Sequence, residues 1–425
     1  MEHDLVLEGK VVRPTGIEEL QVGVSGGQIA EVRRQGLRGA KKIRGERCLI
    51  FPGFVDIHVH LREPGWELKE DFRTGTEAAL HGGVTTVVDM PNNPIPATTV
   101  AVLKEKSSRA KAKARVEVRF FGGVDGKNLD HIGMIKDIVV GYKIYLSSST
   151  GSLPFPKEVL SEAFRRILNT GLPVSLHCED QAIIDRMTRL LEGTERPDVH
   201  CDIRPPEAEV TAVSAVIDAL RGAKGVHANV CHASTGMTLD LVSMAAREGL
   251  NIQCEATLHH LYYNRKAMLD NGLLKTNPPL RSEDERQALL RGVSSGAVSF
   301  LVTDHAPHNE EEKISLGLSG VPGLDDFAHI ISWLIKSQGV DPVTIARVAS
   351  FNPSKYAGMK DEGEVSVGKS ADFAILDLDS PEKVSRDDVR SKCGWSPYEG
   401  REFPGRAKWT IARGEVLLDD YEIVG

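Results

Sequence analysis

Several side chains of the kinds that bind metal ions stand at the ends of segments that have the pattern of β-strands. His58 and His60 are two residues apart, so the period of two in a strand points both imidazoles the same way. Together, four imidazoles and one carboxylate favour Zn²⁺ or a similar ion. The full set of positions is His58, His60, Lys143, His177, His232 and Asp304. A lone strand histidine is usually a core residue, so it is the joint pattern that predicts a metal centre.

Lys143 is the unexpected member of this set, because an ammonium repels cations and offers no lone pair. It fits if the amine loses its proton and reacts with CO₂, which gives a carbamate able to bridge two metals. Such a bridge would hold two ions about 3.5–4 Å apart with a shared hydroxide between them. The charge of the metals would stabilise the carbamate, so we expect lysine carboxylation and metal binding to depend on each other.

The elements that carry these residues alternate between strand-like and helix-like segments. Repeated β-α units predict parallel strands with right-handed crossovers, and eight such units favour a closed (β/α)₈ barrel of the TIM type in an α/β protein. A doubly wound sheet is the alternative, but no GxGxxG follows the first strand. Catalytic groups of barrels gather at the C-terminal ends of the strands, where the six residues fall. The predicted strands are 55–61, 84–90, 116–122, 140–146, 173–179, 226–232, 251–257 and 298–304.

The two ends of the chain differ from its middle. Residues 1–51 and 359–425 contain short alternating segments separated by glycine-containing turns, which is typical of antiparallel strands. We expect both ends to form one small β-sandwich domain beside a barrel of residues 52–358. The basic stretch 104–115 has helical spacing and is expected to be a solvated helix face.

Composition excludes several classes of protein. The 425 residues hold 52 Lys and Arg against 60 Asp and Glu, a net charge of −8, which argues against nucleic-acid binding. No apolar run approaches the length of a membrane helix, and the first ten residues lack the features of a secretory signal. The 6 cysteines include no CxxC pair. We therefore expect free thiols in a cytoplasmic protein that binds neither nucleic acid nor membrane.

The segments around the six residues carry recognisable motifs. They include HLREPG, MPNN, KIYL, LHCED, CHAST, TNPPLR and DHAPH followed by EEEK, and the similarity continues to GEVSVGKSADFAILD near the C-terminus. Over nearly its whole length the chain resembles the cyclic-amide branch of the amidohydrolase superfamily, and within it the type I dihydroorotases. HxHLREPG is shared with hydantoinases and allantoinases, whereas MPNN, TNPPLR and DHAPH with EEEK look more like dihydroorotases.

The resemblance implies roles for the metal-binding positions. It implies two Zn²⁺ ions per subunit, bridged by carboxylated Lys143 and a hydroxide. His58, His60 and Asp304 match ligands of the first ion, and His177 and His232 match ligands of the second. Asp304 also matches the catalytic group that moves protons between water and the ring nitrogen.

The substrate implied by the resemblance is (S)-dihydroorotate, a cyclic amide with one carboxylate, formed reversibly from N-carbamoyl-L-aspartate in pyrimidine (UMP) biosynthesis. A guanidinium matches a carboxylate in a planar, bidentate way, and Arg62 follows His60 on the same strand face. Ser319 and Gly320 are weaker candidates because their segment departs from the family wording. The expected substrate contacts are His60, Arg62, Asn92, Asn277, His308, Ser319 and Gly320.

Several further expectations stay open at this stage. The Ser- and Gly-rich stretch 147–155 could order over substrate as a lid, with Thr150 as its contact. His259 and His260 are expected to be structural supports. Other readings are a hydantoinase or allantoinase, or a non-catalytic scaffold relative, although scaffold relatives have usually lost metal ligands. The family habit implies a homodimer, whereas the sequence leaves open whether the chain acts alone or in association with aspartate transcarbamoylase.

Overall fold

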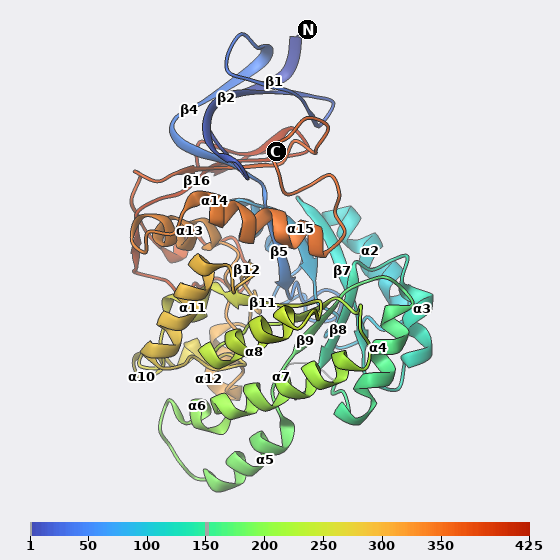
Figure 1. Ribbon diagram of the computed structural model, residues 1–425. Helices are drawn as coiled ribbons and strands as arrows, with labels where there is room; N and C mark the ends of the chain where they lie inside the picture. Colours follow the sequence, from blue (N-terminus) through green and yellow to red (C-terminus); the bar gives the residue numbers. More distant parts are fainter. Residues whose placement is uncertain (1, 149–152) are drawn as a thin grey trace.

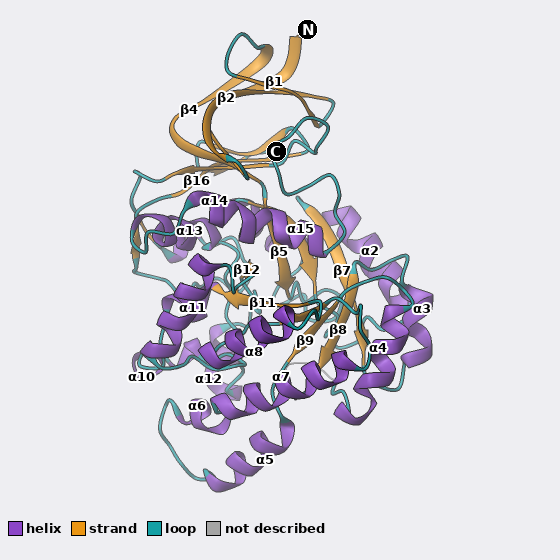
Figure 2. Ribbon diagram, viewed as in Figure 1, coloured by secondary structure: helices purple, strands orange, loops and turns teal. Residues whose placement is uncertain are grey.

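The computed structural model describes residues 2–148 and 153–425, and it has two main parts. A barrel of parallel strands surrounded by helices forms the larger part (Figure 1). A sheet of long, curled strands stands at one end of it (Figure 2). Both chain termini lie at the end of the molecule that carries this sheet.

The barrel strands follow one another in sequence order and all neighbouring pairs are parallel. The ring closes between its last and first strands, where Val59 bridges His305 and the His60 amide donates to the His305 carbonyl at 2.8 Å. All eight predicted strands are confirmed, each within a few residues of its expected bounds. They are β5 (Phe54–Val59), β6 (Val84–Asp89), β7 (Glu117–Val124), β8 (Gly141–Tyr145), β9 (Val174–His177), β10 (Ala228–Val230), β11 (Ile252–Thr257) and β12 (Phe300–Val302).

Helices cover the outside of the barrel, and several begin at side chains that cap them. Asp71, Thr99 and Thr235 accept backbone N–H groups of the first turns that follow them, which satisfies donors a helix start leaves free. The helices are α1 (Phe72–His81), α2 (Val100–Lys113), α3 (Ile132–Ile135), α4 (Leu160–Leu168), α5 (Gln181–Leu190), α6 (Val199–Ile203), α7 (Pro206–Arg221), α8 (Gly236–Arg247), α9 (Leu258–Tyr262), α10 (Ala267–Asp270), α11 (Glu283–Ser295), α12 (Glu310–Leu316), α13 (Phe327–Lys336), α14 (Pro342–Ala346) and α15 (Asn352–Tyr356).

The second sheet joins the two ends of the chain. Its order is β18-β17-β16-β13-β4-β1-β2-β3, and β4 pairs antiparallel with β13. A separate hydrophobic core, which includes Val22, Ile50 and Phe373, stabilises this sheet. The division of the chain into domains stays a prediction. The strands are β1 (Glu2–Arg13), β2 (Gly16–Ser25), β3 (Gln28–Arg33), β4 (Arg38–Pro52), β13 (Phe373–Asp377), β16 (Arg406–Ala412), β17 (Glu415–Asp419) and β18 (Glu422–Ile423).

Part of the C-terminal region packs on the barrel rather than on this sheet. Between β13 and β16 the chain forms a small antiparallel pair, β14 (Glu382–Lys383) and β15 (Glu402–Phe403). Tyr398 and Phe403 belong to the large hydrophobic core that also contains the barrel strands. Residues far along the sequence therefore pack against the barrel and its helices.

The basic stretch 104–115 behaves as expected with one exception. It lies mostly within α2, and Lys104, Lys111 and Lys113 are exposed. The expectation of a solvated face is wrong at Lys106, which is 1% exposed and lies 2.8 Å from the Asp89 carboxylate. Helical periodicity turns this one position inward, where the carboxylate compensates the cost of burying its charge.

Two sequence expectations concern the whole molecule. All six cysteines are free thiols, and five of them are buried. Among the helices of the described residues, none combines the length and apolar character that crossing a bilayer requires.

Candidate metal centre and substrate cavity

The six predicted metal ligands converge at the C-terminal mouth of the barrel. His58 lies in β5, Lys143 in β8 and His177 at the last position of β9, whereas the other three lie one or two residues beyond the ends of strands. Asp304 Oδ1 lies 3.0 Å from His60 Nε2 and 3.3 Å from His58 Nε2. His177 Nδ1 lies 3.0 Å from His232 Nε2, and Lys143 Nζ lies 3.4 Å from His58 Nε2. All six are buried, so the structure brings the predicted set into one cluster.

The backbone at this cluster is strained. Arg62, His232 and Asp304 have φ angles of 62°, 36° and 47°, in the left-handed region that side chains other than glycine rarely adopt. In the described chain, half of the six non-glycine residues with positive φ lie at this site. Such strain persists where surrounding contacts fix the conformation, and it concentrates at functional sites.

Neighbouring acceptors determine which imidazole nitrogens carry protons. Glu255 accepts from His58 Nδ1, and the Asn92 carbonyl oxygen lies 2.7 Å from His60 Nδ1. Each partner requires the proton on Nδ1, which leaves the Nε2 lone pair facing Asp304. Glu179 in the same way lies 2.9 Å from His177 Nε2, so the His177 Nδ1 lone pair faces His232. Such second partners orient metal-binding histidines in proteins.

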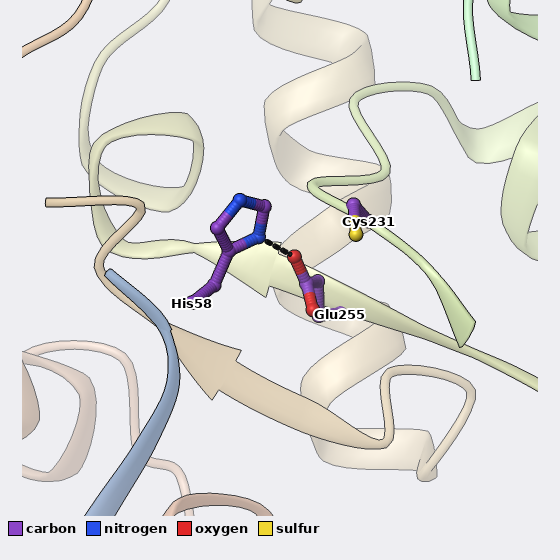
Figure 3. A group of neighbouring side chains, drawn as sticks. All are labelled: His58, Cys231 and Glu255. Carbon is purple, nitrogen blue, oxygen red and sulfur yellow. Dashed lines mark hydrogen bonds and ion pairs between the residues drawn. The ribbon is translucent and has the colours of Figure 1, made fainter. Parts of the chain in front are cut away.

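These donors fit a metal ion. One donor atom each from His58, His232 and Asp304 lies within 4.8 Å of the others, and all three residues are buried. The buried Nδ1 of His232 has no hydrogen-bond partner among the described residues, an arrangement that a bound cation would resolve. A second group, His58 with Cys231 and Glu255, also has one donor atom from each residue within 4.8 Å of the others (Figure 3).

Burial keeps the imidazoles neutral, which is the form that binds metal. It lowers the pKa of His58, and together with Arg62 it lowers the pKa of His60 well below its usual range. The pKa of His232 is also far below normal, through burial and the nearby His177. Burial raises the pKa of Asp304, so its carboxyl exchanges protons closer to neutral pH than an exposed aspartate does.

Sequence reasoning missed the residues that support the histidines. Glu255 lies within β11, where it also accepts from the Asn229 amide at 2.7 Å, and Cys231 accepts from Lys143 at 2.8 Å. Burial would raise the pKa of Glu179, but Arg204 and His177 outweigh it and lower that pKa to about 2. A carboxylate in the middle of a predicted barrel strand was the available signal, since an ionised side chain is rarely buried without a partner.

A small cavity opens beside the cluster. Seven of its eight lining residues are positions predicted for catalysis or substrate binding, and the eighth is Ala306. The structure thus brings together residues from five separate segments, although their roles stay predictions. The lining residues are His60, Arg62, Asn92, Asn277, Asp304, Ala306, Ser319 and Gly320.

Gly320 can lie here only because it has no side chain. Its φ is +126°, and a Cβ atom would meet the carbonyl oxygen of Ala306 at 2.5 Å. Its own N–H donates to the Lys275 carbonyl at 2.9 Å, and its carbonyl accepts from Lys313. The Gly320 backbone is therefore already hydrogen-bonded, which leaves the predicted contact with a substrate to the open face of the residue.

His308 is the predicted contact that does not line the cavity. Its Nε2 lies 3.2 Å from the Ser319 carbonyl and 3.3 Å from Arg62 Nη2, and Lys69 Nζ lies 3.2 Å from its Nδ1. Burial and then Arg62 lower the pKa of His308 to about 2, so this imidazole is neutral. It lies behind Arg62 as a neutral support between cations.

The remaining sequence predictions have mixed outcomes. Thr150 and the centre of the proposed lid lie outside the described residues. His260 is bound between Thr257 and the Pro278 carbonyl, which suits a support. His200, to which no role was given, has its Nε2 2.9 Å from Asn277 Oδ1 and so holds one wall of the cavity.

Comparison with known proteins identifies the family to which this chain belongs. Residues 49–417 match the model of the amidohydrolase family. The chain belongs to the amidohydrolase family. This membership agrees with a barrel whose strand ends carry imidazoles, a lysine and a carboxylate, and it makes the chain a hydrolase.

Curated relatives and solved structures match over nearly the full length. A dihydroorotase of Pyrococcus furiosus is 33% identical over 99% of this chain and 94% of its own length. A dihydroorotase of Methanosarcina acetivorans is 34% identical over 88% of this chain and 83% of its own length. The solved L-hydantoinase (dihydropyrimidinase) of Arthrobacter aurescens has a TM-score of 0.96 at 25% identity, covering 100% of this chain and 98% of that one. These matches support the (β/α)₈ barrel with its accompanying β-sheet part.

Proposed function

We propose that this chain is a dihydroorotase, which interconverts N-carbamoyl-L-aspartate and (S)-dihydroorotate and in the cell runs toward ring closure in pyrimidine synthesis. The names of the curated relatives support this assignment. The observation that carries it is Arg62. Its buried guanidinium lines the cavity that also holds Asp304, and among the described residues no carboxylate lies within ion-pair distance of it. A substrate carboxylate would be the missing partner.

The cofactor part of the proposal is two Zn²⁺ ions per subunit with carboxylated Lys143 between them. His58, His60 and Asp304 would hold one ion and His177 and His232 the other, with the Lys143 carbamate shared. When bound, such ions polarise a carbonyl group and activate water at neutral pH. Lys143 is fully buried, and its amine lies against His58 and Cys231 rather than a carboxylate, which suits conversion to an anion.

Asp304 would move the proton in both directions. During ring opening it would accept a proton from the attacking water and deliver it to the departing ring nitrogen. During ring closure it would take a proton from the ureido nitrogen of the open substrate. Asp304 lines the cavity in which the ring would bind, so its carboxyl would lie close to the groups that exchange the proton.

The other cavity residues would orient the ring. Arg62 would donate two parallel hydrogen bonds to the substrate carboxylate, with its Nε already held by the Pro307 carbonyl at 3.2 Å. Asn92 holds His60 and lines the same cavity, and Asn277 with Ser319 would provide further polar contacts there. Gly320 would contact the ring through the part of its backbone that faces the cavity.

A hydantoinase is the competing assignment, since the L-hydantoinase of Arthrobacter aurescens has nearly the same fold. Its substrate class is a cyclic amide that needs no carboxylate anchor. Purified enzyme should turn over dihydroorotate and N-carbamoyl-L-aspartate, and orotate should inhibit it. Turnover of hydantoin or allantoin without inhibition by orotate would reject the dihydroorotase assignment. A protein that binds no zinc and hydrolyses none of these would instead support the scaffold reading.

The remaining parts of the proposal concern the cellular context. We infer a cytoplasmic homodimer that associates with aspartate transcarbamoylase, from the free thiols and from the family resemblance. Light scattering of the pure protein tests the dimer, and co-purification from cell extract tests the association. A monomer in solution would reject the dimer.

A further inference from the structure

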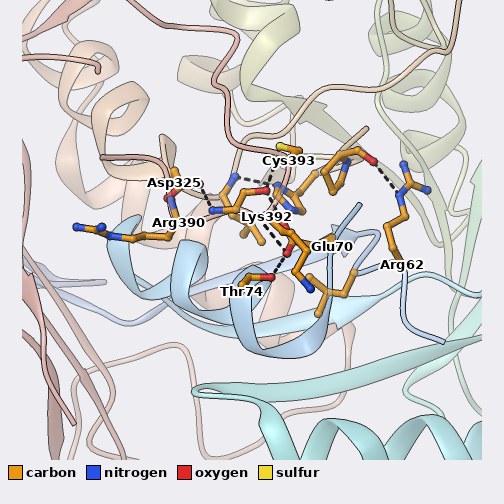
Figure 4. Close-up of polar contacts among 12 residues, drawn as sticks. Arg62, Glu70, Thr74, Asp325, Arg390, Lys392 and Cys393 are labelled. Carbon is orange, nitrogen blue, oxygen red and sulfur yellow. Dashed lines mark hydrogen bonds and ion pairs between the residues drawn. The ribbon is translucent and has the colours of Figure 1, made fainter. Parts of the chain in front are cut away.

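The short segment Ser391–Trp395, which we call the C-terminal strap, lies against the loop that follows Arg62 (Figure 4). Ser391 is 3% exposed and Trp395 is 1% exposed. The Lys392 amide donates to Glu70 across 322 residues of sequence. The buried Ser391 hydroxyl donates to the same carboxylate, and contacts of such long range fix one segment relative to the other.

Glu70 is the point where the strap meets the barrel. Its carboxylate is completely buried, and among the described residues it lies within ion-pair distance of His305 alone, at 3.3 Å. Hydroxyl and amide groups satisfy the rest of the carboxylate, as buried charge requires. These donors are Ser391 Oγ, Thr74 Oγ1 and the amides of Asp71 and Lys392.

Through His305, Glu70 acts on the backbone beside Asp304. The Gly323 amide donates to His305 Nδ1 at 3.1 Å, so the ring proton is on Nε2 and points at Glu70. On the other side, the Thr303 amide donates to Asp56 at 3.0 Å. Asp304 therefore keeps its strained φ of 47° between two anchored neighbours.

The other end of the strap acts on Arg62. The indole N–H of Trp395 donates to the His308 carbonyl at 2.8 Å. His308 lies 3.3 Å from Arg62 Nη2, and the preceding residue, Pro307, holds Arg62 Nε. The position of the Arg62 guanidinium thus depends on the backbone of Pro307 and His308, which Trp395 holds in place.

We propose that the strap positions both ends of the site: Ser391, through Glu70 and His305, positions Asp304, and Trp395, through His308, positions Arg62. The identity of the substrate in this proposal rests on the proposed function. A group that moves protons acts only during the reaction, whereas a carboxylate anchor binds ground state and transition state alike. The two ends of the strap should therefore affect different kinetic constants.

The first test replaces Ser391 in the full-length, zinc-loaded enzyme. Ser391→Ala should lower kcat for dihydroorotate about 10-fold, and Glu70→Gln should lower it about 10–100-fold, with KM and zinc content unchanged. Ser396→Ala is the matched control, because Ser396 is a buried serine of the next segment that donates to Asp326 at 2.7 Å, away from the cavity. It should leave kcat unchanged.

The second test removes one N–H group. Trp395→Phe should raise KM for dihydroorotate about 3–10-fold, the effect of one hydrogen bond, and leave kcat unchanged. Trp409→Phe is the control, since its indole donates to Asp419 at 2.8 Å within the second sheet. It should change neither constant.

The proposal is overturned if Ser391→Ala folds and keeps wild-type kcat, or if Trp395→Phe leaves KM unchanged. A purely structural strap would lower the melting temperature in both variants without this split between kcat and KM. Failure of the proposed function is a separate result, seen as wild-type enzyme that does not turn over dihydroorotate. The Ser391 test then uses the cyclic amide that the wild type does hydrolyse. The contacts of Ser391 act through Asp304, and this effect does not depend on which ring is the substrate.

Discussion

The two ends of the substrate cavity are built from opposite kinds of group. At one end, neutral imidazoles surround the carboxyl of Asp304, whose pKa is raised by burial. At the other end, the buried cation Arg62 lies beside His308, which Lys69 contacts from its other nitrogen, and burial lowers the pKa of Arg62 to about 10. The first end suits cations and the second suits an anion. A ligand that joins a reactive amide to a carboxylate would match both.

The two ends also differ in what holds them. His58 and His177 lie within barrel strands, so the backbone ladder fixes them. Arg62 lies in a loop and depends on Pro307, His308 and a strap from the far C-terminal region. Chemistry at the first end should therefore respond to changes of ligand, and binding at the second to changes in loop contacts.

The largest loss of activity should come from removing Lys143, whose carbamate would supply negative charge to the metal ions at the first end. Lys143→Gln cannot be carboxylated, so we expect it to lose both bound zinc and all measurable turnover while it keeps its helical circular dichroism. Chelation of wild-type enzyme should give the same loss, reversed by zinc and bicarbonate. Lys106→Gln, at another buried lysine, is the control and should retain zinc. Full zinc content and activity in Lys143→Gln would show that no carbamate is needed.

Next in size is the proton-transfer group itself. Asp304→Asn should lower kcat by about 10²–10⁴-fold, because an amide cannot take up the proton. The protein should keep its fold, since Asn preserves the shape of the side chain. Steady-state rates and circular dichroism check both parts. Near-normal kcat would be fatal to the role assigned to Asp304.

The second end is tested by replacing the guanidinium of Arg62 with an amine. Arg62→Lys keeps the charge and loses the planar pair of N–H groups. We expect KM for dihydroorotate to rise about 10–100-fold, with kcat much less affected, because charge-assisted hydrogen bonds of this kind bind both states alike. Orotate inhibition should weaken in parallel. An unchanged KM would show that the substrate carboxylate is bound elsewhere.

The comparison also explains what the sequence could predict. The first end follows strand periodicity, so His58, His60 and Asp304 stood out at strand ends, and the eight strands could be placed. Glu255 was not found, because a carboxylate inside a buried strand shows its purpose only once His58 is known to face it.

The second end was only half predictable for a related reason. Arg62 and Asn277 could be inferred from motifs, whereas the support of Arg62 by Trp395 joins segments that no local pattern connects. The burial of Lys106 could not be predicted either, because Lys106 lies in α2 and its buried partner Asp89 ends β6. Contacts that depend on tertiary packing leave no periodic trace in the sequence.

A histidine outside the cavity sharpens the contrast with the site. Burial would lower the pKa of His329, as it does for His58, but hydrogen bonds from its ring to Asp326 and Glu382 outweigh burial and raise that pKa to about 9. His329 is therefore an imidazolium that links α13 to β14, whereas the site histidines are neutral. At His58, burial and the charge of Lys143 lower the pKa more than the Glu255 and Asp304 carboxylates raise it. The same side chain therefore takes either form according to whether its carboxylate partners outweigh burial and nearby positive charge.

The sign of the resulting pH dependence follows from the raised pKa. The stabilisation by His329 is fully present below its unfolded pKa near 6.5 and is lost as pH rises through about 9. Urea unfolding of wild type should show stability falling between pH 7 and 10 more steeply than that of His329→Gln, by about 1–3 kcal/mol over the range. Because His329 lies outside the cavity, KM for dihydroorotate should be the same in both proteins. Equal pH slopes for the two proteins would mean that His329 is neutral in the fold, and the contrast with the site histidines would then disappear.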